Sequence, residues 1–191
     1  ILFPHHPYGT QTTIGTQQHL KNPSLRNVMQ YYREWYVPNN VAICMSGDLD
    51  PDETVRIIEK YFGDWQPSDS LPKRIFPQEK PLEAPVSVDV VGMETPMVAL
   101  GWRLPAKADP QYGIMSVVQQ ILTNGKCGLF DENLNNAQQV MQAMTFLDGM
   151  TDQSAFWAIG CPKEGQSLEE VRDLMLSQVR LLAGGEWDES L

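Results

Sequence analysis

The sequence predicts an α+β fold with a mostly antiparallel sheet and helices packed on one of its faces. Within residues 86–191, strand-like segments occur in pairs, and one amphipathic helix follows each pair. A third observation concerns residues 66–85, whose five prolines cannot form a helix or a central strand. We therefore expect one domain that ends in residues 1–65, a linker at 66–85 and a second domain at 86–191.

The first 22 residues form a polar segment that contains all three histidines, His5, His6 and His19. A zinc peptidase needs three ligands and a general base, usually a glutamate beside the ligands. Two adjacent histidines are poorly placed to bind one metal ion, and no acidic residue precedes Glu34. We therefore predict loop packing for these histidines and no metal ligand in this chain.

The sequence of residues 22–63 predicts a helix, a buried strand and a second helix. Asn22-Pro23 opens a helix whose apolar side chains recur at helical spacing as far as Trp35 or Tyr36. The apolar run from Val41 to Met45 is typical of a strand covered on both faces. Asp50 can cap the helix that follows, which Gly63 would end. Each acidic residue of this turn therefore has a capping role, which argues against a catalytic site.

The second domain predicts four strands and three helices. The expected strands are Val86–Val91, which alternates valine with polar residues, Pro96–Leu104, Val140–Phe146 and Ser154–Cys161, the last two joined near Asp148-Gly149. The expected helices are Gln111–Thr123, introduced by Asp109-Pro110, a short helix at Gly128–Leu134, and a long one capped by Ser167 with Glu170 and ended by Gly184-Gly185.

Composition excludes several functions. The net charge of −10 and the lack of a basic patch argue against nucleic acid and anionic membranes, and no apolar stretch is long enough to span a membrane. Three widely spaced cysteines form neither a disulfide framework nor a zinc knuckle. There is no Gly-x-Ser-x-Gly motif, and the adjacent Asp131 and Glu132 project in different directions from a helix. We predict no catalytic residue in this chain.

Several motifs together resemble the insulinase/pitrilysin family of zinc metallopeptidases, the inverzincins. In the first domain these are HPYG, TTIGT, HLKNPS, YYREWYVPNNVAICMSGDLDPDE and IIEKYFGDW. In the second domain they are NGKCGLFDENL at 124–134, the strand pair from Val140 to Cys161, and PKEGQSLEEV at 162–171. The resemblance covers nearly the whole chain. It implies that residues 1–65 are the C-terminal remainder of the catalytic-type domain and that residues 86–191 are a second, non-catalytic domain, truncated at its C-terminus.

The resemblance implies a non-catalytic role for this part of such a peptidase. The family's metal site is H-x-x-E-H with a downstream glutamate, and all of it precedes the position that matches His6-Pro7. Zinc is thus expected in the parent protein and no cofactor in this fragment. The ending GGEWDESL also resembles a cut helix start, with Asp188 as its cap. We expect a non-catalytic fragment of a zinc-dependent metalloendopeptidase; the alternative is a fragment of an inactive structural or partner subunit.

The family also implies where a peptide would bind. Its repeated α+β domains enclose a chamber in which extended peptides bind partly by adding to a sheet edge. By resemblance, the strand Val140–Phe146 and the Asn124–Gly128 turn provide the substrate-binding candidates Gly125, Met141, Ala143 and Thr145. The other expected partner is the rest of the parent chain. Bacterial members are often exported, which implies the cell envelope, the periplasm or secretion.

Residues 1–65 supply few elements of a domain, so their apolar faces should lack partners. We therefore expect self-association of the chain, or folding of this segment back onto the second domain.

Overall fold

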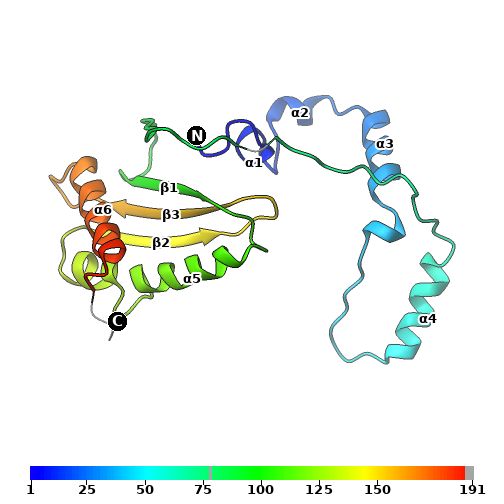
Figure 1. Ribbon diagram of the computed structural model, residues 1–191. Coiled ribbons are helices and arrows are strands. Elements are labelled where there is room, and N and C mark those ends of the chain that lie inside the picture. Colours follow the sequence, from blue (N-terminus) through cyan, green and yellow to red (C-terminus); the bar gives the residue numbers. More distant parts are fainter. Residues whose placement is uncertain (78, 188–191) are drawn as a thin grey trace. The chain divides into compact units, whose positions relative to one another are not determined.

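The computed structural model describes residues 1–77 and 79–187 and divides the chain into two compact units (Figure 1). Unit 1 comprises Ile1 and Phe3–Ala84, and unit 2 comprises Leu2 and Pro85–Leu191. The division falls at the end of the proline-rich tract. The expected helix start at Asp188 lies outside the described residues.

Unit 1 consists of short helices joined by extended chain. Its elements are α1 (Pro7–Thr10), α2 (Gln17–Lys21), α3 (Leu25–Trp35), the 3-10 helix η1 (Pro38–Asn40) and α4 (Pro51–Phe62). Asp50 caps α4, because its side chain accepts a hydrogen bond from the Glu53 N–H at 2.9 Å. Within the described residues of this unit there is no strand, so the prediction for Val41–Met45 is wrong. Ile43 and Met45 are 50% and 53% exposed, because no neighbouring strand pairs with this segment or covers it.

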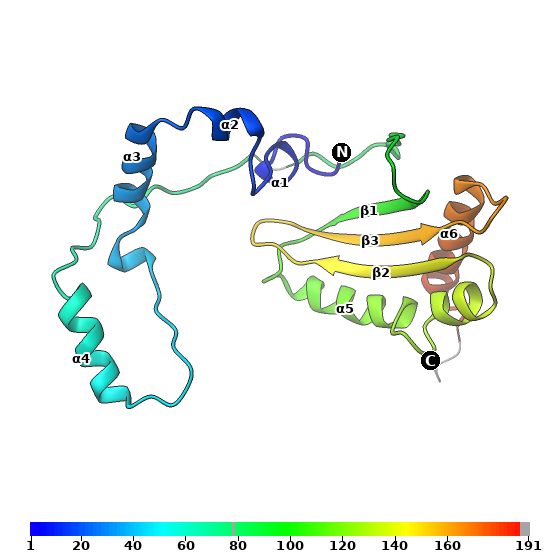
Figure 2. The same cartoon turned by 180° about the vertical axis from the view of Figure 1, so that it is seen from behind.

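Unit 2 contains an antiparallel sheet in the order β1-β3-β2 (Figure 2). Its elements are β1 (Val98–Leu104), α5 (Pro110–Leu122), the π-helix η2 (Asp131–Asn136), β2 (Gln142–Asp148), β3 (Ser154–Cys161) and α6 (Leu168–Gly184). This arrangement confirms the α+β class. The prediction of a strand at Val86–Val91 is wrong: Val90 and Val91 are 86% and 99% exposed. The predicted helix at Gly128–Leu134 is a π-helix that begins three residues later.

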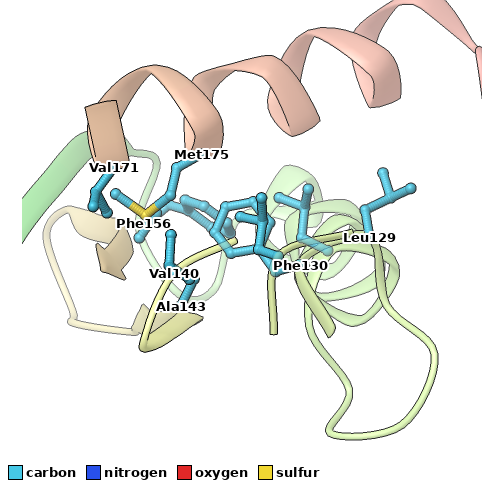
Figure 3. Packing of buried hydrophobic residues seen from close by; sticks show 10 residues of the cluster. Leu129, Phe130, Val140, Ala143, Phe156, Val171 and Met175 are labelled. Carbon is cyan, nitrogen blue, oxygen red and sulfur yellow. The ribbon is translucent and has the colours of Figure 1, made fainter. Parts of the chain in front are cut away.

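The core of unit 2 lies between one face of the sheet and the helices (Figure 3). Phe130 and Met175 are fully buried, and Phe156 of β3 is 4% exposed. The helix α6 lies so close to β3 that a Cβ on Gly160 would be 2.5 Å from Val171 Cγ1. Ser167 and Glu170 form the expected capping box at the start of α6. The core therefore fixes the positions of α5, η2 and α6 against the sheet.

Candidate functional site

A buried carboxylate organises the loop between α5 and η2. Asp131 is 7% exposed. Its Oδ2 accepts hydrogen bonds from the backbone N–H groups of Asn124 at 2.9 Å, Gly125 at 2.9 Å and Gly128 at 3.2 Å. These three bonds compensate the cost of burying the charge. The loop 124–128 is therefore held in one conformation at the end of α5.

The side chain of Asn124 also stabilises this loop through hydrogen bonds. Its Oδ1 accepts hydrogen bonds from the N–H groups of Lys126 at 2.9 Å and Cys127 at 3.0 Å, which is a local turn typical of asparagine. Gly125 has φ +78°, a conformation that glycine adopts without steric cost. Gly125, a predicted site residue, is exposed at this turn.

Two of the other three predicted site residues, Ala143 and Thr145, lie on the strand β2, and the third, Met141, precedes it. Met141 is 59% exposed and lies just before the strand. Ala143 and Thr145 are 2% and 5% exposed, because their side chains face the core. A peptide at this strand would therefore meet Ala143 and Thr145 through their backbone, while Met141 and Gly125 could meet it directly.

Two side-chain amides lie on the outer edge of β2. The Ala143 N–H donates to Asn135 Oδ1 at 2.7 Å, and Asn135 Nδ2 donates to the Ala143 carbonyl at 2.9 Å. Gln119 Nε2 of α5 donates to the Thr145 carbonyl at 3.3 Å. Figures 1 and 2 both show α5 alongside β2. Sequence patterns gave no signal for Asn135 or Gln119, because each acts through a contact set by tertiary packing.

A hollow of about 530 Å³ lies at the start of β2. It is lined by Asn135, Gln138, Val140, Met141, Lys163 and Glu164. Lys163 Nζ donates to the Gln138 carbonyl at 2.7 Å, which ties the chain before β2 to the segment after β3. The lining of the hollow thus combines the apolar Val140 and Met141 with the charged Lys163 and Glu164.

Two of the three histidines of unit 1, His5 and His6, share the acceptor Glu79. His5 Nδ1 lies 3.0 Å from Glu79 Oε2, and the N–H groups of His5 and His6 donate to Glu79 Oε1 at 2.7 and 2.9 Å. Burial alone would raise the pKa of Glu79, but these hydrogen bonds from His5 and His6 hold that pKa below its usual value. The ring of His6 packs against Phe76 with centroids 4.8 Å apart.

His19 lies on the short helix α2 and is exposed. In residues 1–77 and 79–187, no group of three or more His, Cys, Asp or Glu side chains could hold a metal ion. No helix in this part of the chain is long and apolar enough to cross a membrane. No sequence pattern predicts the contacts of Glu79, which lies in the proline-rich tract.

Comparison with known proteins places this architecture among peptidase domains. The family model described as the peptidase M16 inactive domain matches residues 24–191. The zinc protease PqqE of Helicobacter pylori is 22% identical over 191 residues, which cover 96% of this chain and 42% of that protein. A probable mitochondrial-processing peptidase subunit beta of Schizosaccharomyces pombe is 30% identical over 63 residues, or 33% of this chain and 14% of that one.

Two solved structures share the fold. A protease from Helicobacter pylori superposes with a TM-score of 0.78 at 20% identity, covering 98% of this chain and 46% of that one. The periplasmic protease PqqL from Escherichia coli superposes with a TM-score of 0.54 at 17% identity, covering 90% and 22%. The chain thus spans less than half the length of each of these four proteins.

Proposed function

This chain belongs to the family of the peptidase M16 inactive domain, and on that basis we propose that it is a non-catalytic part of a zinc-dependent metalloendopeptidase. Its role is to form part of the wall of the chamber that binds peptide substrates. The family match to an inactive domain carries this proposal. The ordered 124–128 loop and the strand β2 support it, since an extended peptide can add to the edge of a strand.

Zinc belongs to the parent protein in this proposal, and the metal site lies outside this chain. The support is the similarity to the zinc protease PqqE. Elemental analysis should find about one zinc per chain in the full-length parent and substoichiometric zinc in residues 1–191. One tightly held zinc in residues 1–191 would contradict the proposal and would reopen a role for His5, His6 and His19.

The peptide-contacting surface proposed here consists of Gly125 and Met141 directly and of Ala143 and Thr145 through their backbone. Replacing the exposed Met141 with aspartate should weaken the binding of a fluorescein-labelled, unstructured neutral peptide, because a charge then lines the hollow at β2. Met93→Asp is the matched control, since Met93 is fully exposed in the same unit. Fluorescence anisotropy that shows equal affinities for both variants would argue against this surface.

A second candidate function is a structural role in a catalytically inactive partner subunit of the same fold. The observation that favours it is that the matching family describes an inactive domain. The two candidates differ upstream in the parent chain: an H-x-x-E-H motif with a downstream glutamate supports the peptidase, and its loss supports the inactive subunit.

The same comparisons support our proposals for the remaining partners and for the compartment. The chain docks against the rest of its parent, because it spans less than half of its relatives' length. In isolation it self-associates through the exposed apolar side chains of unit 1. The periplasmic location of the structural neighbour PqqL supports an envelope or periplasmic site.

A further inference from the structure

The outer edge of β2 is occupied by a side chain that imitates a neighbouring strand. The amide of Asn135 both accepts from the Ala143 N–H, at 2.7 Å, and donates to the Ala143 carbonyl, at 2.9 Å. A residue on a paired antiparallel strand exchanges the same two bonds with its partner. Asn135 therefore takes the place that one residue of an added strand would occupy.

The pairing of β2 with β3 shows which backbone groups of β2 face outward and which of these already have a hydrogen-bond partner. Backbone groups of successive residues point to opposite sides of a strand, so Ala143, Thr145 and Leu147 direct theirs away from β3. Gln119 Nε2 takes the Thr145 carbonyl at 3.3 Å. No side chain of the described residues bonds the Thr145 N–H or the backbone of Leu147. Side-chain amides thus hold this edge at Ala143 and at the Thr145 carbonyl, and α5 lies alongside it (Figures 1 and 2).

The opposite edge of the sheet has no such closure. By the register of β1 with β3, Ala99, Gly101 and Arg103 direct their backbone groups outward. Within the part of the chain that the structure describes, no side chain bonds these groups. Of the two edges of the sheet, only the β2 edge thus has side-chain amides bonded to its backbone within the described residues. The same strand carries the predicted site residues Ala143 and Thr145.

Asn135 is held in position by the π-helix η2. Leu134, its neighbour, is 1% exposed and anchors η2 in the core. Asn133 Nδ2 donates to Gln178 Oε1 of α6 at 2.7 Å, and the Gln139 N–H donates to the Leu134 carbonyl at 2.8 Å. A π-helical turn is uncommon and is frequent at functional sites. These contacts anchor the backbone on both sides of Asn135, so pairing of a strand with Ala143 requires displacement of the Asn135 side chain together with this turn of η2.

We propose that Asn135 is a latch on the β2 edge: its amide closes the backbone of Ala143 against strand addition, and a bound peptide must displace it. This inference rests on the proposed peptide-binding role of β2. A peptide strand that adds to β2 competes with Asn135 for the N–H and the carbonyl of Ala143. Binding of a peptide at Ala143 must break the two hydrogen bonds between Asn135 and Ala143. Peptides that also make contacts in the adjacent hollow should therefore bind more tightly than peptides that do not.

The test compares Asn135→Ala with Asn136→Ala in the full 191-residue chain. Asn136 lies on the same π-helix, is exposed, and donates only to Glu132 Oε1 at 3.3 Å. Amide hydrogen exchange at Ala143 reports closure of the edge. Anisotropy of a labelled unstructured peptide reports competition. We expect Asn135→Ala to speed exchange at Ala143 and to tighten peptide binding, each by about fivefold or more, and Asn136→Ala to change neither.

Each other outcome has a defined meaning. Unchanged exchange at Ala143 in a folded Asn135→Ala variant contradicts the claim that Asn135 closes the β2 edge. Faster exchange with unchanged or weaker peptide binding contradicts the claim that Asn135 competes with a peptide for Ala143. If no variant and not even the unaltered chain binds peptide, the proposed function of β2 fails, while the exchange result still decides whether Asn135 closes the edge.

Asn135→Asp provides a second test if the alanine variant does not fold. Its carboxylate still accepts from the Ala143 N–H but cannot donate to the Ala143 carbonyl. We expect slow exchange at Ala143 to persist in this variant while peptide binding tightens. Fast exchange at Ala143 in folded Asn135→Asp would contradict the two-bond latch.

Discussion

The carboxylate of Asp131 accepts a hydrogen bond from the backbone N–H of Gly125 at 2.9 Å and so fixes the turn that follows α5. The same oxygen accepts from Asn124 and Gly128, so a single buried atom orders the whole loop. Its neighbour Glu132 is exposed and has no part in this arrangement.

Replacing Asp131 with alanine should destabilise unit 2 by about 2–4 kcal/mol, because three buried or part-buried N–H groups lose a charged acceptor. Urea unfolding followed by tryptophan fluorescence measures this loss. Glu132→Ala is the matched control and should change the free energy of unfolding by less than about 0.5 kcal/mol. Equal effects of the two substitutions would refute the assigned role of Asp131.

The close approach of α6 to β3 makes Gly160 sensitive to added volume. A Cβ at this position would lie 2.5 Å from Val171 Cγ1 and 3.0 Å from Met175 Sδ. Gly160→Ala should therefore cost about 1–3 kcal/mol of the free energy of unfolding. Gly113→Ala in α5 is the control: a Cβ there has open space around it, and this change should stabilise the helix by up to about 1 kcal/mol.

The contacts of Glu79 predict a loss of order in unit 1 at acid pH. The pKa of Glu79 is lowered from 4.5 in the folded state, so its carboxylate contributes stability above that value, and this contribution is lost as pH falls through the lower folded pKa. Chemical shifts of the His5 and His6 amides, followed from pH 6 downward, should report the transition. Glu79→Gln should abolish it, whereas Glu83→Gln should leave it in place.

Helix patterns, caps and turns could be predicted from the sequence because they depend on neighbouring residues. The capping box of Ser167 and Glu170 and the cap of Asp50 need only their own helices. The strands β1 and β3 were also predictable from their apolar runs: β3 contributes buried residues to the core, and apolar residues of β1 pack against it partly buried. The match to the peptidase M16 inactive domain confirms the family that the motifs indicate.

The wrong predictions share one physical cause. Val41–Met45 and Val86–Val91 have the composition of strands, but a strand exists only when another strand pairs with it, and no local pattern supplies that partner. The contacts of Asn135 with Ala143 and of Gln119 with Thr145 could likewise not be predicted from the sequence, because they join elements through tertiary packing.

Unit 1 should promote self-association, because its helices expose their apolar side chains. On α3, Leu25 and Val28 are 74% and 54% exposed. Val28→Glu should shift the elution volume in size-exclusion chromatography toward that of a monomer, since it places a charge in the apolar stripe. Asn27→Glu adds the same charge outside the stripe and should leave the elution volume unchanged. A monomeric unaltered chain at all concentrations would refute self-association.

The most direct test of the proposed role is to measure peptide binding and peptide cleavage by the same purified chain, with zinc added. A labelled unstructured peptide is titrated by anisotropy, and the mixture is then analysed by mass spectrometry. We expect saturable binding with the peptide intact, as required of a non-catalytic chamber wall. Cleavage that zinc chelation abolishes would show a catalytic site within these 191 residues, and a complete lack of binding would remove the peptide-binding role from this chain.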